Sequence, residues 1–347
     1  WGFGRSGWGE ASNSSAYFRK ISLVPTKQIE YIPNMQIDNS TVIAIFAFKR
    51  PLHTRLITEA LLRNHNISNY SVYFFCDASN NASEQLDIQE TRKFIQSIEG
   101  FKSKRIFIQN EPLGLANSII RGVTQCLESF SQVIVLEDDI LTDVNFLNFM
   151  NLCLEKYKDA PFVFGVGGYN YPNSLLKFPP NYPWDTYFSI RPSSWGWATW
   201  KDRWERIIWE NPHPDKIRNK RLIQCLNRGG TDLHNMLFEL SLGKIDSWAI
   251  RYLLHHFLNK HVTIFPRISL VDNIGFDGTG RHCSYNTKLS NQLENKRNKT
   301  WSFPPTISSD MNLQKSIAQI NSYSFFYTLR LTLSRLRKKF ISRYHAE

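Results

Sequence analysis

The sequence has few cysteines, and they form no recognisable pattern. Five cysteines are spread through 347 residues, and no two of them make a C-x-x-C pair. An odd and scattered set argues against a disulfide framework and against a zinc ribbon. We therefore expect reduced thiols and a cytosolic setting.

Long apolar runs are also missing. The longest is about eight residues, around 42–48, whereas a helix that crosses a bilayer needs about 20. The first twelve residues, WGFGRSGWGEAS, lack the charged and then apolar layout of a secretion signal. We expect no transmembrane helix, and we interpret 1–40 as a lead-in segment. No internal duplication is found.

The overall composition is that of a globular protein. Hydrophobic residues make up 42% and charged residues 21%, so a disordered or fibrous chain is not expected. Lys and Arg number 42 against 30 Asp and Glu, a net charge of +12. This excess favours anionic partners such as phosphorylated small molecules, acidic lipid or nucleic acid. Nucleic acid is the least expected, because the charge gathers near one end of the chain.

Apolar segments and helical patterns alternate through the first half of the chain. Strands are predicted at 41–48, 71–75, 105–109 and 133–136, and helices at 52–64, 84–98 and 113–128. This alternation predicts an α/β fold of the doubly wound class, a mostly parallel sheet with helices on both faces. From about 160 the elements are shorter and more aromatic, as in an elaborated lobe that completes a cleft.

Polar residues follow the predicted strands at the edge where ligands bind in such sheets. Arg50 follows the first strand, Asp77 the second, and Glu137-Asp138-Asp139 the fourth. Three adjacent acids cost free energy unless a cation or hydrogen-bond donors offset their charge. One interpretation is a solvated turn; the other is a site for Mg²⁺ or Mn²⁺, which take carboxylate and phosphate oxygens. Position at a strand end favours the metal.

The helix expected after the acidic triplet needs an N-cap. Thr142 or Asp143 could supply it.

Five motifs in order resemble the GT-A glycosyltransferases. They are AFKRP at 47–51, FCD at 75–77, VLEDDI at 135–140, IDSW at 245–248 and GFDGTGRH at 275–282. The nearest branch is that of N-acetylglucosaminyltransferase I and its bacterial sugar-transferase relatives. The resemblance spans roughly 41–285 and implies a Rossmann-like GT-A domain at 41–290. Its nucleotide-sugar half would be 41–150 and its acceptor and catalytic half 151–290, with an extension at 291–347.

The resemblance also implies roles for the acidic triplet. Asp139 would bind the divalent ion that bridges the nucleotide diphosphate. Asp138 would contact the ribose or the uracil side of the nucleotide, and Glu137 the donor sugar.

Three further residues receive roles in the same way. Arg50 would touch the nucleotide phosphate or base, and the alternative is a surface cation. Asp77 would read the base or ribose, and the alternative is a strand-end cap. His282 is either a metal ligand, as in some GT-A enzymes, or an ordinary loop histidine.

Asp246 matches the catalytic base of the family. The family has paired acids at this point, whereas this chain has Asp246-Ser247 and so a single candidate. A carboxylate that removes the proton of an attacking hydroxyl typically contributes ~10² to 10⁴ in rate. Single-step displacement with inversion would follow. The alternative is a helix-start cap.

The aromatic segment SSWGWATW at 193–200 has two interpretations. Trp195 and Trp197 flank Gly196, and family likeness makes them a cleft wall for the sugar. Trp200 and Trp204, four apart on an expected helix, are interpreted as core.

The last segment, 323–344, combines apolar residues at helical spacing with six cations. We predict a basic amphipathic helix that lies on an anionic membrane surface. A helix docked on its own domain is the alternative.

Together these features predict a metal-dependent, inverting glycosyltransferase of the hexosyl or N-acetylhexosaminyl class, with Mn²⁺ or Mg²⁺ as cofactor. A UDP-sugar is the favoured donor, with a glycan or lipid-linked hydroxyl as acceptor. The expected location is cytoplasmic, peripheral on the inner face of the membrane. The alternative is a catalytically silent carbohydrate-binding or nucleotide-sugar-binding protein. A sugar-phosphate nucleotidyltransferase is disfavoured, because AFKRPL after the first strand contains no glycine.

Overall fold

The computed structural model describes residues 40–277, 287–296 and 299–322. The lead-in segment 1–39, the histidine His282 and the basic segment 323–344 lie outside these described residues. The predictions made for them stay predictions.

A mixed sheet of eight strands forms the centre of the molecule, in the order β3-β2-β1-β4-β8-β6-β9-β7. The strands β1 to β4 are mutually parallel, and β8 enters antiparallel between β4 and β6. The strands are β1 (Thr41–Ala47), β2 (Ser71–Cys76), β3 (Ser103–Ile108), β4 (Gln132–Glu137), β6 (Val163–Gly167), β7 (Thr186–Ser189), β8 (Trp197–Trp200) and β9 (Val262–Pro266). A separate pair, β5 (Ile140–Thr142) and β10 (Val271–Asn273), is antiparallel.

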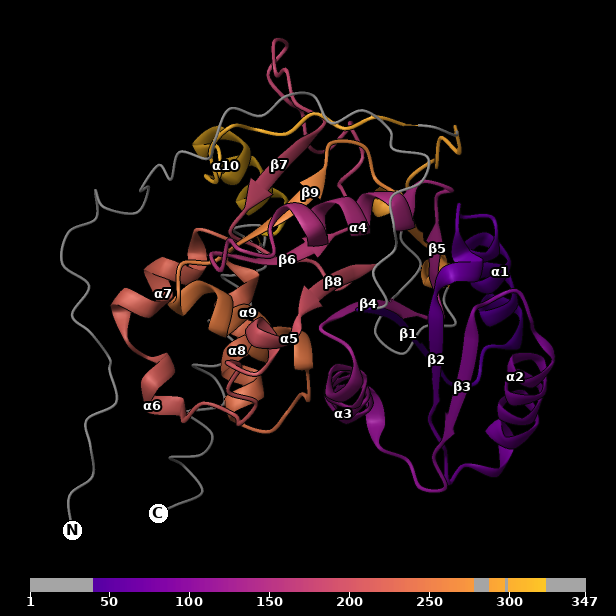
Figure 1. The fold of residues 1–347 in the computed structure, drawn as a ribbon. Helices are drawn as coiled ribbons and strands as arrows, with labels where there is room; N and C mark the ends of the chain where they lie inside the picture. Colours follow the sequence, from indigo (N-terminus) through magenta and orange to yellow (C-terminus); the bar gives the residue numbers. More distant parts are fainter. Residues whose placement is uncertain (1–39, 278–286, 297–298, 323–347) are drawn as a thin grey trace, which may run out of the picture.

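Helices cover both faces of the sheet, which confirms the predicted α/β class (Figure 1). The helices are α1 (Pro51–Leu62), α2 (Gln85–Ser97), α3 (Gly114–Ser129), α4 (Phe146–Lys156), α5 (Lys201–Trp204), α6 (Pro214–Ile217), α7 (Lys220–Asn227), α8 (Asp232–Ser241), α9 (Trp248–Leu258) and α10 (Met311–Ile320). No helix among the described residues is long and apolar enough to span a bilayer.

The alternation of side chains along β1 divides the core in two. Ile43 and Ile45 face α1, α2 and α4, whereas Val42 and Ala44 face α3, α5 and α9. All seven residues of β1 are buried, as expected of a strand covered on both faces. This is why its sequence is an apolar run without alternation.

The second half of the chain continues the same sheet. Its strands β6 to β9 extend the sheet beyond β4, while α6 to α9 gather around an apolar cluster of their own, at the lower left of Figure 1. Part of the predicted extension at 291–347 packs against the sheet as well. Trp301 is 2% exposed in the main core, and α10 packs on β7 and β9 through Leu313 and Ile317.

Two local predictions were wrong. Neither Thr142 nor Asp143 caps α4: Thr142 ends β5, and Asn145 is the N-cap residue. Asp143 instead accepts hydrogen bonds from the backbone N–H of Asn145 and of Asn295. Trp200 lies at the end of β8 and not on a helix, although it is buried in the core as predicted.

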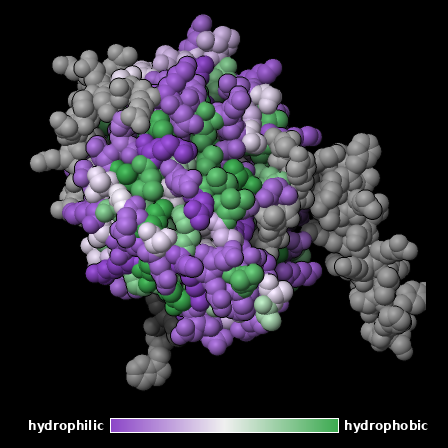
Figure 2. All heavy atoms as spheres, turned by 90° about the vertical axis from the view of Figure 1, so that its right-hand side faces the viewer, coloured by the Kyte–Doolittle hydropathy of each residue, from purple (hydrophilic) through white to green (hydrophobic). Residues whose placement is uncertain are grey.

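The face formed by α1, α2 and β3 is mostly hydrophilic, with separate apolar groups on it (Figure 2). Leu52 and Leu56 on α1 and Leu86 on α2 are among its exposed apolar side chains.

Candidate functional site

The acidic triplet lies at the carboxyl end of β4, beside the loop that follows β1. The two strands are neighbours, and Phe46 pairs with Glu137 in their register. Asp138 and Asp139 are only 4% and 8% exposed. Arg50 and these acids therefore lie together at one edge of the sheet.

Arg50 joins both aspartates through one guanidinium group. Its Nη2 lies 3.0 Å from Asp138 Oδ1, and Nη1 and Nη2 each donate to Asp139 Oδ2 at 3.1 Å. It is thus no free surface cation but the partner of two buried carboxylates. Charge-assisted hydrogen bonds of this kind are stronger than neutral ones.

The three acids differ in their other partners. Asp138 Oδ2 accepts a hydrogen bond from the backbone N–H of Phe48 at 3.1 Å. The carboxylate of Asp139 has Arg50 as its partner, and among the described residues nothing bonds its Oδ1. In that same part of the chain no hydrogen bond or ion pair holds the Glu137 carboxylate.

The pKa values reflect burial first and the mutual repulsion of the acids second. Burial, followed by the charges of Asp139 and Asp138, raises the pKa of Glu137 to about 8 against the lowering effect of Arg50. Burial also raises the pKa of Asp138 to about 6, against the lowering effect of Arg50. For Arg50, burial lowers the pKa, but Asp138 and Asp139 outweigh burial and leave it above its usual value. Perturbed carboxyl groups of this kind are typical of functional sites.

A segment from the far end of the chain forms one wall of the site. The strand β10 pairs with β5, and the 3₁₀ turn η3 (Ile274–Asp277) follows it. The backbone N–H of Ile274 donates to the carbonyl oxygen of Asp139 at 2.9 Å. At the end of η3, Asp277 lies 3.1 Å from His53 Nε2 on α1.

Gly275 allows this wall to come close. A Cβ at this position would lie 2.4 Å from Asp139 Oδ2 and 3.0 Å from Arg50 Nη1, so any larger residue would displace the ion pair. Sequence reasoning missed Gly275 as a site residue, although it opens the GFDGTGRH motif.

The acidic site offers a divalent ion few protein ligands. In the described part of the chain no group of three or more His, Cys, Asp and Glu side chains is arranged to hold a metal. Asp139 Oδ1 and the Glu137 oxygens nevertheless lack protein partners among the described residues. Mg²⁺ and Mn²⁺ commonly take one or two protein carboxylates and fill their coordination with substrate phosphate and water. The residues present fit an ion of that kind.

Asp77 occupies its predicted place at the end of β2, but its carboxylate is engaged by the backbone. Oδ1 accepts from the N–H groups of Ala78 and Leu113, both at 2.9 Å, and Oδ2 accepts from Gly114 at 3.0 Å. Since Gly114 is the first residue of α3, Asp77 ties β2 to the start of that helix. A role in reading the nucleotide stays a prediction.

The two tryptophans around Gly196 have different surroundings. Trp197 is 3% exposed and stacks on Trp248 and Trp204, with ring centroids 4.9 and 5.8 Å apart. Its faces are covered, so it is a core residue in this structure. Trp195 is partly buried and meets Tyr169 and Phe276 edge to face, at 4.4 and 5.4 Å. Phe276 follows Gly275, and thus Trp195 adjoins the wall of the acidic site.

Asp246 lies on the connection between α8 and α9. Its side chain is 55% exposed and pairs with Arg251 Nη2 at 2.6 Å. Ser247, the next residue, caps α9 by accepting from the N–H of Ile250 at 3.4 Å. No contact within the described residues joins Asp246 to the acidic triplet, and its assignment as the base stays a prediction.

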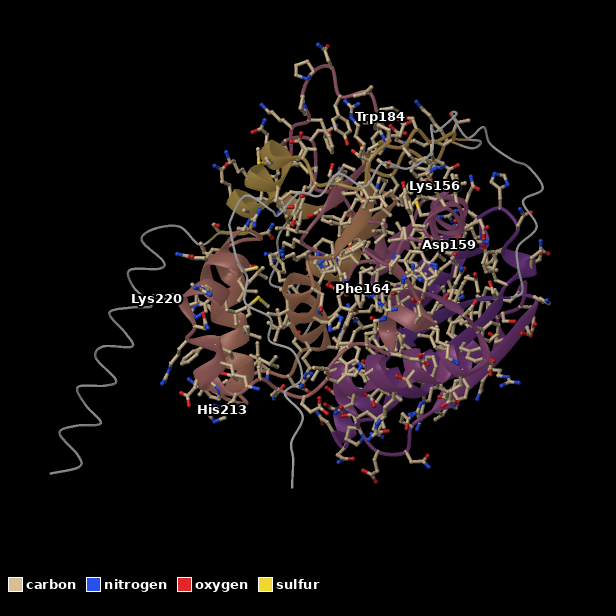
Figure 3. The ribbon with its side chains drawn as sticks, turned by 60° about the vertical axis from the view of Figure 1, so that its left-hand side comes forward. Lys156, Asp159, Phe164, Trp184, His213 and Lys220 are labelled. Atoms are coloured by element: carbon tan, nitrogen blue, oxygen red, sulfur yellow. The ribbon has the colours of Figure 1, made fainter. Side chains whose placement is uncertain are left out.

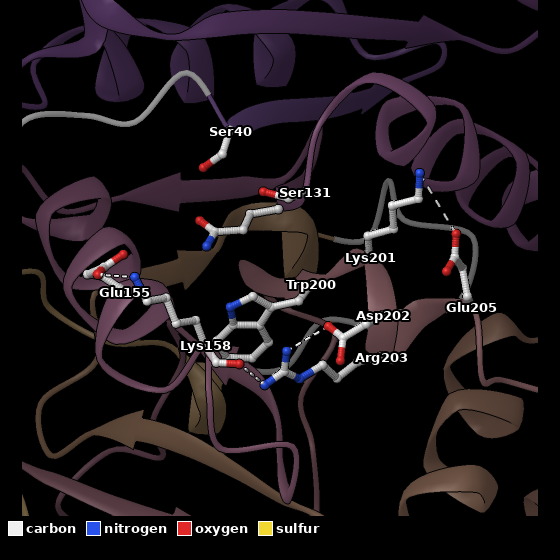
Figure 4. A pocket seen from close by; sticks show the side chains of 10 residues that line it. Ser40, Ser131, Glu155, Lys158, Trp200, Lys201, Asp202, Arg203 and Glu205 are labelled. Carbon is white, nitrogen blue, oxygen red and sulfur yellow. Dashed lines mark hydrogen bonds and ion pairs between the residues drawn. The ribbon is translucent and has the colours of Figure 1, made fainter.

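One open pocket lies elsewhere, at the amino ends of β1 and β4 (Figure 4). Ser40, Gln132 and Trp200 contribute to its lining, together with the ion pair of Arg203 with Asp202. Because β1 and β4 are parallel, this pocket is at the opposite edge of the sheet from the acidic triplet.

No known family model matches the sequence, and no curated protein matches it either. The solved structures to which this chain is similar include TarS 1-349 from S. aureus, with a TM-score of 0.36, 8% identity and 66% of this chain aligned to 59% of that one. The mannosyltransferase PcManGT from Pyrobaculum calidifontis, in complex with GDP-Man and Mn²⁺, is another. Its TM-score is 0.38 and its identity 11%, with 68% of this chain aligned to 73% of that one. The chain spans 59% of the length of the first structure. Likeness at this level carries no argument about activity.

Proposed function

We propose that the protein is a metal-dependent, inverting glycosyltransferase that moves a sugar from a nucleotide diphosphate to a hydroxyl group. One observation carries the proposal. Three acids gather at the carboxyl end of a central strand, where Arg50 alone among the described residues pairs with them.

The charge of this site supports a role for a divalent ion. If all four side chains were ionised, three acids and one arginine would leave two net negative charges in a largely buried place. Burial, and after it the charges of Asp139 and Asp138, raise the pKa of Glu137 to about 8, which supports the view that this acid needs a further positive charge to be ionised at neutral pH. A bound Mn²⁺ or Mg²⁺ would balance this charge and stabilise negative charge on a departing diphosphate.

The chain's own residues would hold the two substrates around that ion. Asp139 and Glu137 would supply ligand oxygens to the ion. Asp138, which accepts a hydrogen bond from the N–H of Phe48, would hold Arg50 in position beside them. Trp195 and Phe276 present aromatic rings next to this site, where the apolar face of a sugar can pack. We favour a UDP-sugar as donor, of the hexosyl or N-acetylhexosaminyl class, and a glycan or lipid-linked acceptor.

Asp246 is the residue we propose as general base, and its position decides between two functions. An exposed carboxylate that pairs with Arg251 has to face the acceptor hydroxyl for catalysis. If it does not, a nucleotide-sugar-binding protein without turnover is the second candidate. Asp246→Asn in an enzyme would lose turnover and keep donor affinity, whereas in a binding protein it would behave as wild type.

The experiment that tests the proposal is a screen of nucleotide sugars for release of nucleoside diphosphate, with Mn²⁺ and with EDTA. We expect release from one donor, lost with EDTA and with Asp139→Ala. Asp215→Ala, which removes an exposed acid on α6, is the matched control and should act as wild type. Release at full rate in EDTA would refute the role of the ion.

A further inference from the structure

The helix α9 begins at the carboxyl edge of the sheet. Trp248, its first residue, stacks on Trp197 with ring centroids 4.9 Å apart. Trp197 pairs with Val135 of β4, two residues before Glu137. Asp246, which precedes α9 by one residue, therefore lies at the same edge of the sheet as the acidic triplet.

Arg251 lies in the first turn of α9, and its side chain reaches back to Asp246. Helical side chains point toward the amino end of their helix, so the guanidinium can return to the residue that precedes α9. Nη2 donates to Asp246 Oδ1 at 2.6 Å, and Nε donates to Asn211 Oδ1 at 3.0 Å. The side chain of Arg251 is only 10% exposed, so the protein surrounds the group that holds this carboxylate.

Asn211 gives the guanidinium a second anchor outside α9. It follows Trp209, whose ring meets that of Trp204 with centroids 4.5 Å apart in the core. The planar guanidinium is thus held at Nε as well as at Nη2, and its orientation is set before any ligand binds. Nη1 is buried without a hydrogen-bond partner among the described residues, so the contacts with Asn211 and Asp246 are the ones that orient Arg251.

The two carboxylate oxygens of Asp246 have different surroundings. Oδ1 accepts from Arg251, whereas no hydrogen bond within the described residues reaches Oδ2. The backbone is held separately, because Ser247 caps α9. Without Arg251, no other described side chain would fix the rotation of this exposed carboxylate, and a misplacement of about 1 Å can cost about 10²-fold in rate.

We infer that Arg251 is a positioning residue, which holds Oδ1 of Asp246 so that Oδ2 meets the hydroxyl that attacks the donor sugar. This inference rests on the proposed function. Oδ2 takes the proton of the hydroxyl while the hydroxyl oxygen bonds to the anomeric carbon, and the electron pair of the broken carbon–oxygen bond leaves with the diphosphate. Arg251 itself touches neither substrate, so its removal can cost no more in rate than removal of the Asp246 carboxylate.

The test measures release of nucleoside diphosphate from the donor that the nucleotide-sugar screen identifies, at saturating Mn²⁺. Arg251→Ala should lower kcat by about tenfold or more and change the KM of the donor by less than about twofold, because the donor site is untouched. The double variant Asp246→Asn/Arg251→Ala should be no slower than Asp246→Asn, because positioning has no effect without the base. The matched control is Arg218→Ala, which breaks an exposed pair with Asp215 at 3.4 Å and should act as wild type.

Rescue separates positioning from a purely structural role. Guanidinium ion, added well below denaturing concentrations, should restore part of kcat to Arg251→Ala and none to Asp246→Asn. Arg251→Lys, which can still donate to Asp246, should keep more turnover than Arg251→Ala. Asn211→Ala removes an exposed side chain and frees only Nε, so it should lower kcat by about threefold or more. It keeps the test open should Arg251→Ala fail to fold.

The inference is overturned if Arg251→Ala turns over the donor as wild type does, or if its defect adds in full to that of Asp246→Asn. A loss of kcat that is matched by a higher KM and by no rescue would mean a structural role, and would overturn it too. If Asp246→Asn keeps full turnover, the base and its positioning residue are both wrong, while the transferase function stands. Failure of the proposed function is a different result: wild type itself would release no nucleoside diphosphate from any donor, and the inference would fall with it.

Discussion

Gly275 and Asp139 touch across 136 positions of sequence, and their contact defines the closed side of the acidic site. A Cβ on Gly275 would stand 2.4 Å from Asp139 Oδ2. Real Cβ atoms do not come so close, so any side chain there must push the carboxylate or the wall away.

We therefore expect Gly275→Ala to weaken Mn²⁺ binding by about tenfold or more, since the displaced atoms are a proposed ligand and its partner. Gly243→Ala is the control, because nothing lies within 4 Å of its added Cβ. It carries only the backbone strain of a left-handed residue, φ +67°. Equal Mn²⁺ affinity of Gly275→Ala and wild type would show that the wall does not constrain the site.

Cation binding should strengthen with rising pH. Glu137 has a pKa raised to about 8, by burial first and by Asp139 and Asp138 next, and it must lose its proton to act as a ligand. The ionised fraction of Glu137 then grows about fifteenfold between about pH 6.5 and about pH 8, and Mn²⁺ affinity should follow it. Titrations in this range measure the effect. Glu137→Gln, which cannot ionise, should flatten the curve; an unchanged slope would mean that another group titrates.

A group of buried histidines should make the protein sensitive to acid. His261 stacks on Phe164, which lies near the middle of Figure 3, with centroids 4.2 Å apart, and His255 and His256 are close by. Burial lowers the pKa of His255 to about 4 and of His261 to about 3, and it lowers that of His256 as well. Repulsion from Arg206 adds to the effect at His255 and His261.

The unfolded chain therefore takes up protons below about pH 6.5 that the folded chain refuses, and the free energy of unfolding falls as pH drops from 6.5 toward 4. Urea unfolding at a series of pH values measures this. His261→Phe keeps the stack and removes the titrating ring, so its stability should depend less on pH over that window. A variant as acid-sensitive as wild type would contradict the assignment.

Substitutions of Trp197 and Trp195 should have different effects, the first on stability and the second on ligand binding. Trp197→Ala leaves a large cavity among Trp204, Trp248 and Tyr252 and should cost about 3–5 kcal/mol of stability. Trp195→Ala should cost less, because this side chain is only partly buried, but should weaken binding of a nucleotide sugar more than of the free nucleotide. Chemical unfolding and calorimetry give the two readings. If Trp195→Ala bound both ligands as wild type does, Trp195 would have no role in binding the sugar.

The sequence was most informative where one element decides its own structure. The apolar run of β1 and the helical spacing of α1 and α3 were predicted within a few residues, because burial on both faces leaves no polar interruption. The acidic triplet and Arg50 could be placed at one edge because parallel strands end together.

What escaped prediction depends on contacts between distant segments. The β5–β10 pair has three residues in each strand, too few for a periodic signal. Gly275 lies against Asp139 only because β10 brings it there, and Trp197 is a core residue only because α9 places Trp248 on its ring. For Asp77 the sequence left a nucleotide-reading role and a strand-end cap open, and it could not show that the N–H groups at the start of α3 donate to this carboxylate.

The insertion of β8 between β4 and β6 limits how this chain can be divided. A fragment that ends near residue 150 would keep β1 to β4 but lose the strand that pairs with Val133 and Val135. Its last strand would then offer unsatisfied N–H and C=O groups to any other chain, which favours aggregation. We therefore expect the first half of the chain to aggregate when it is expressed without the second.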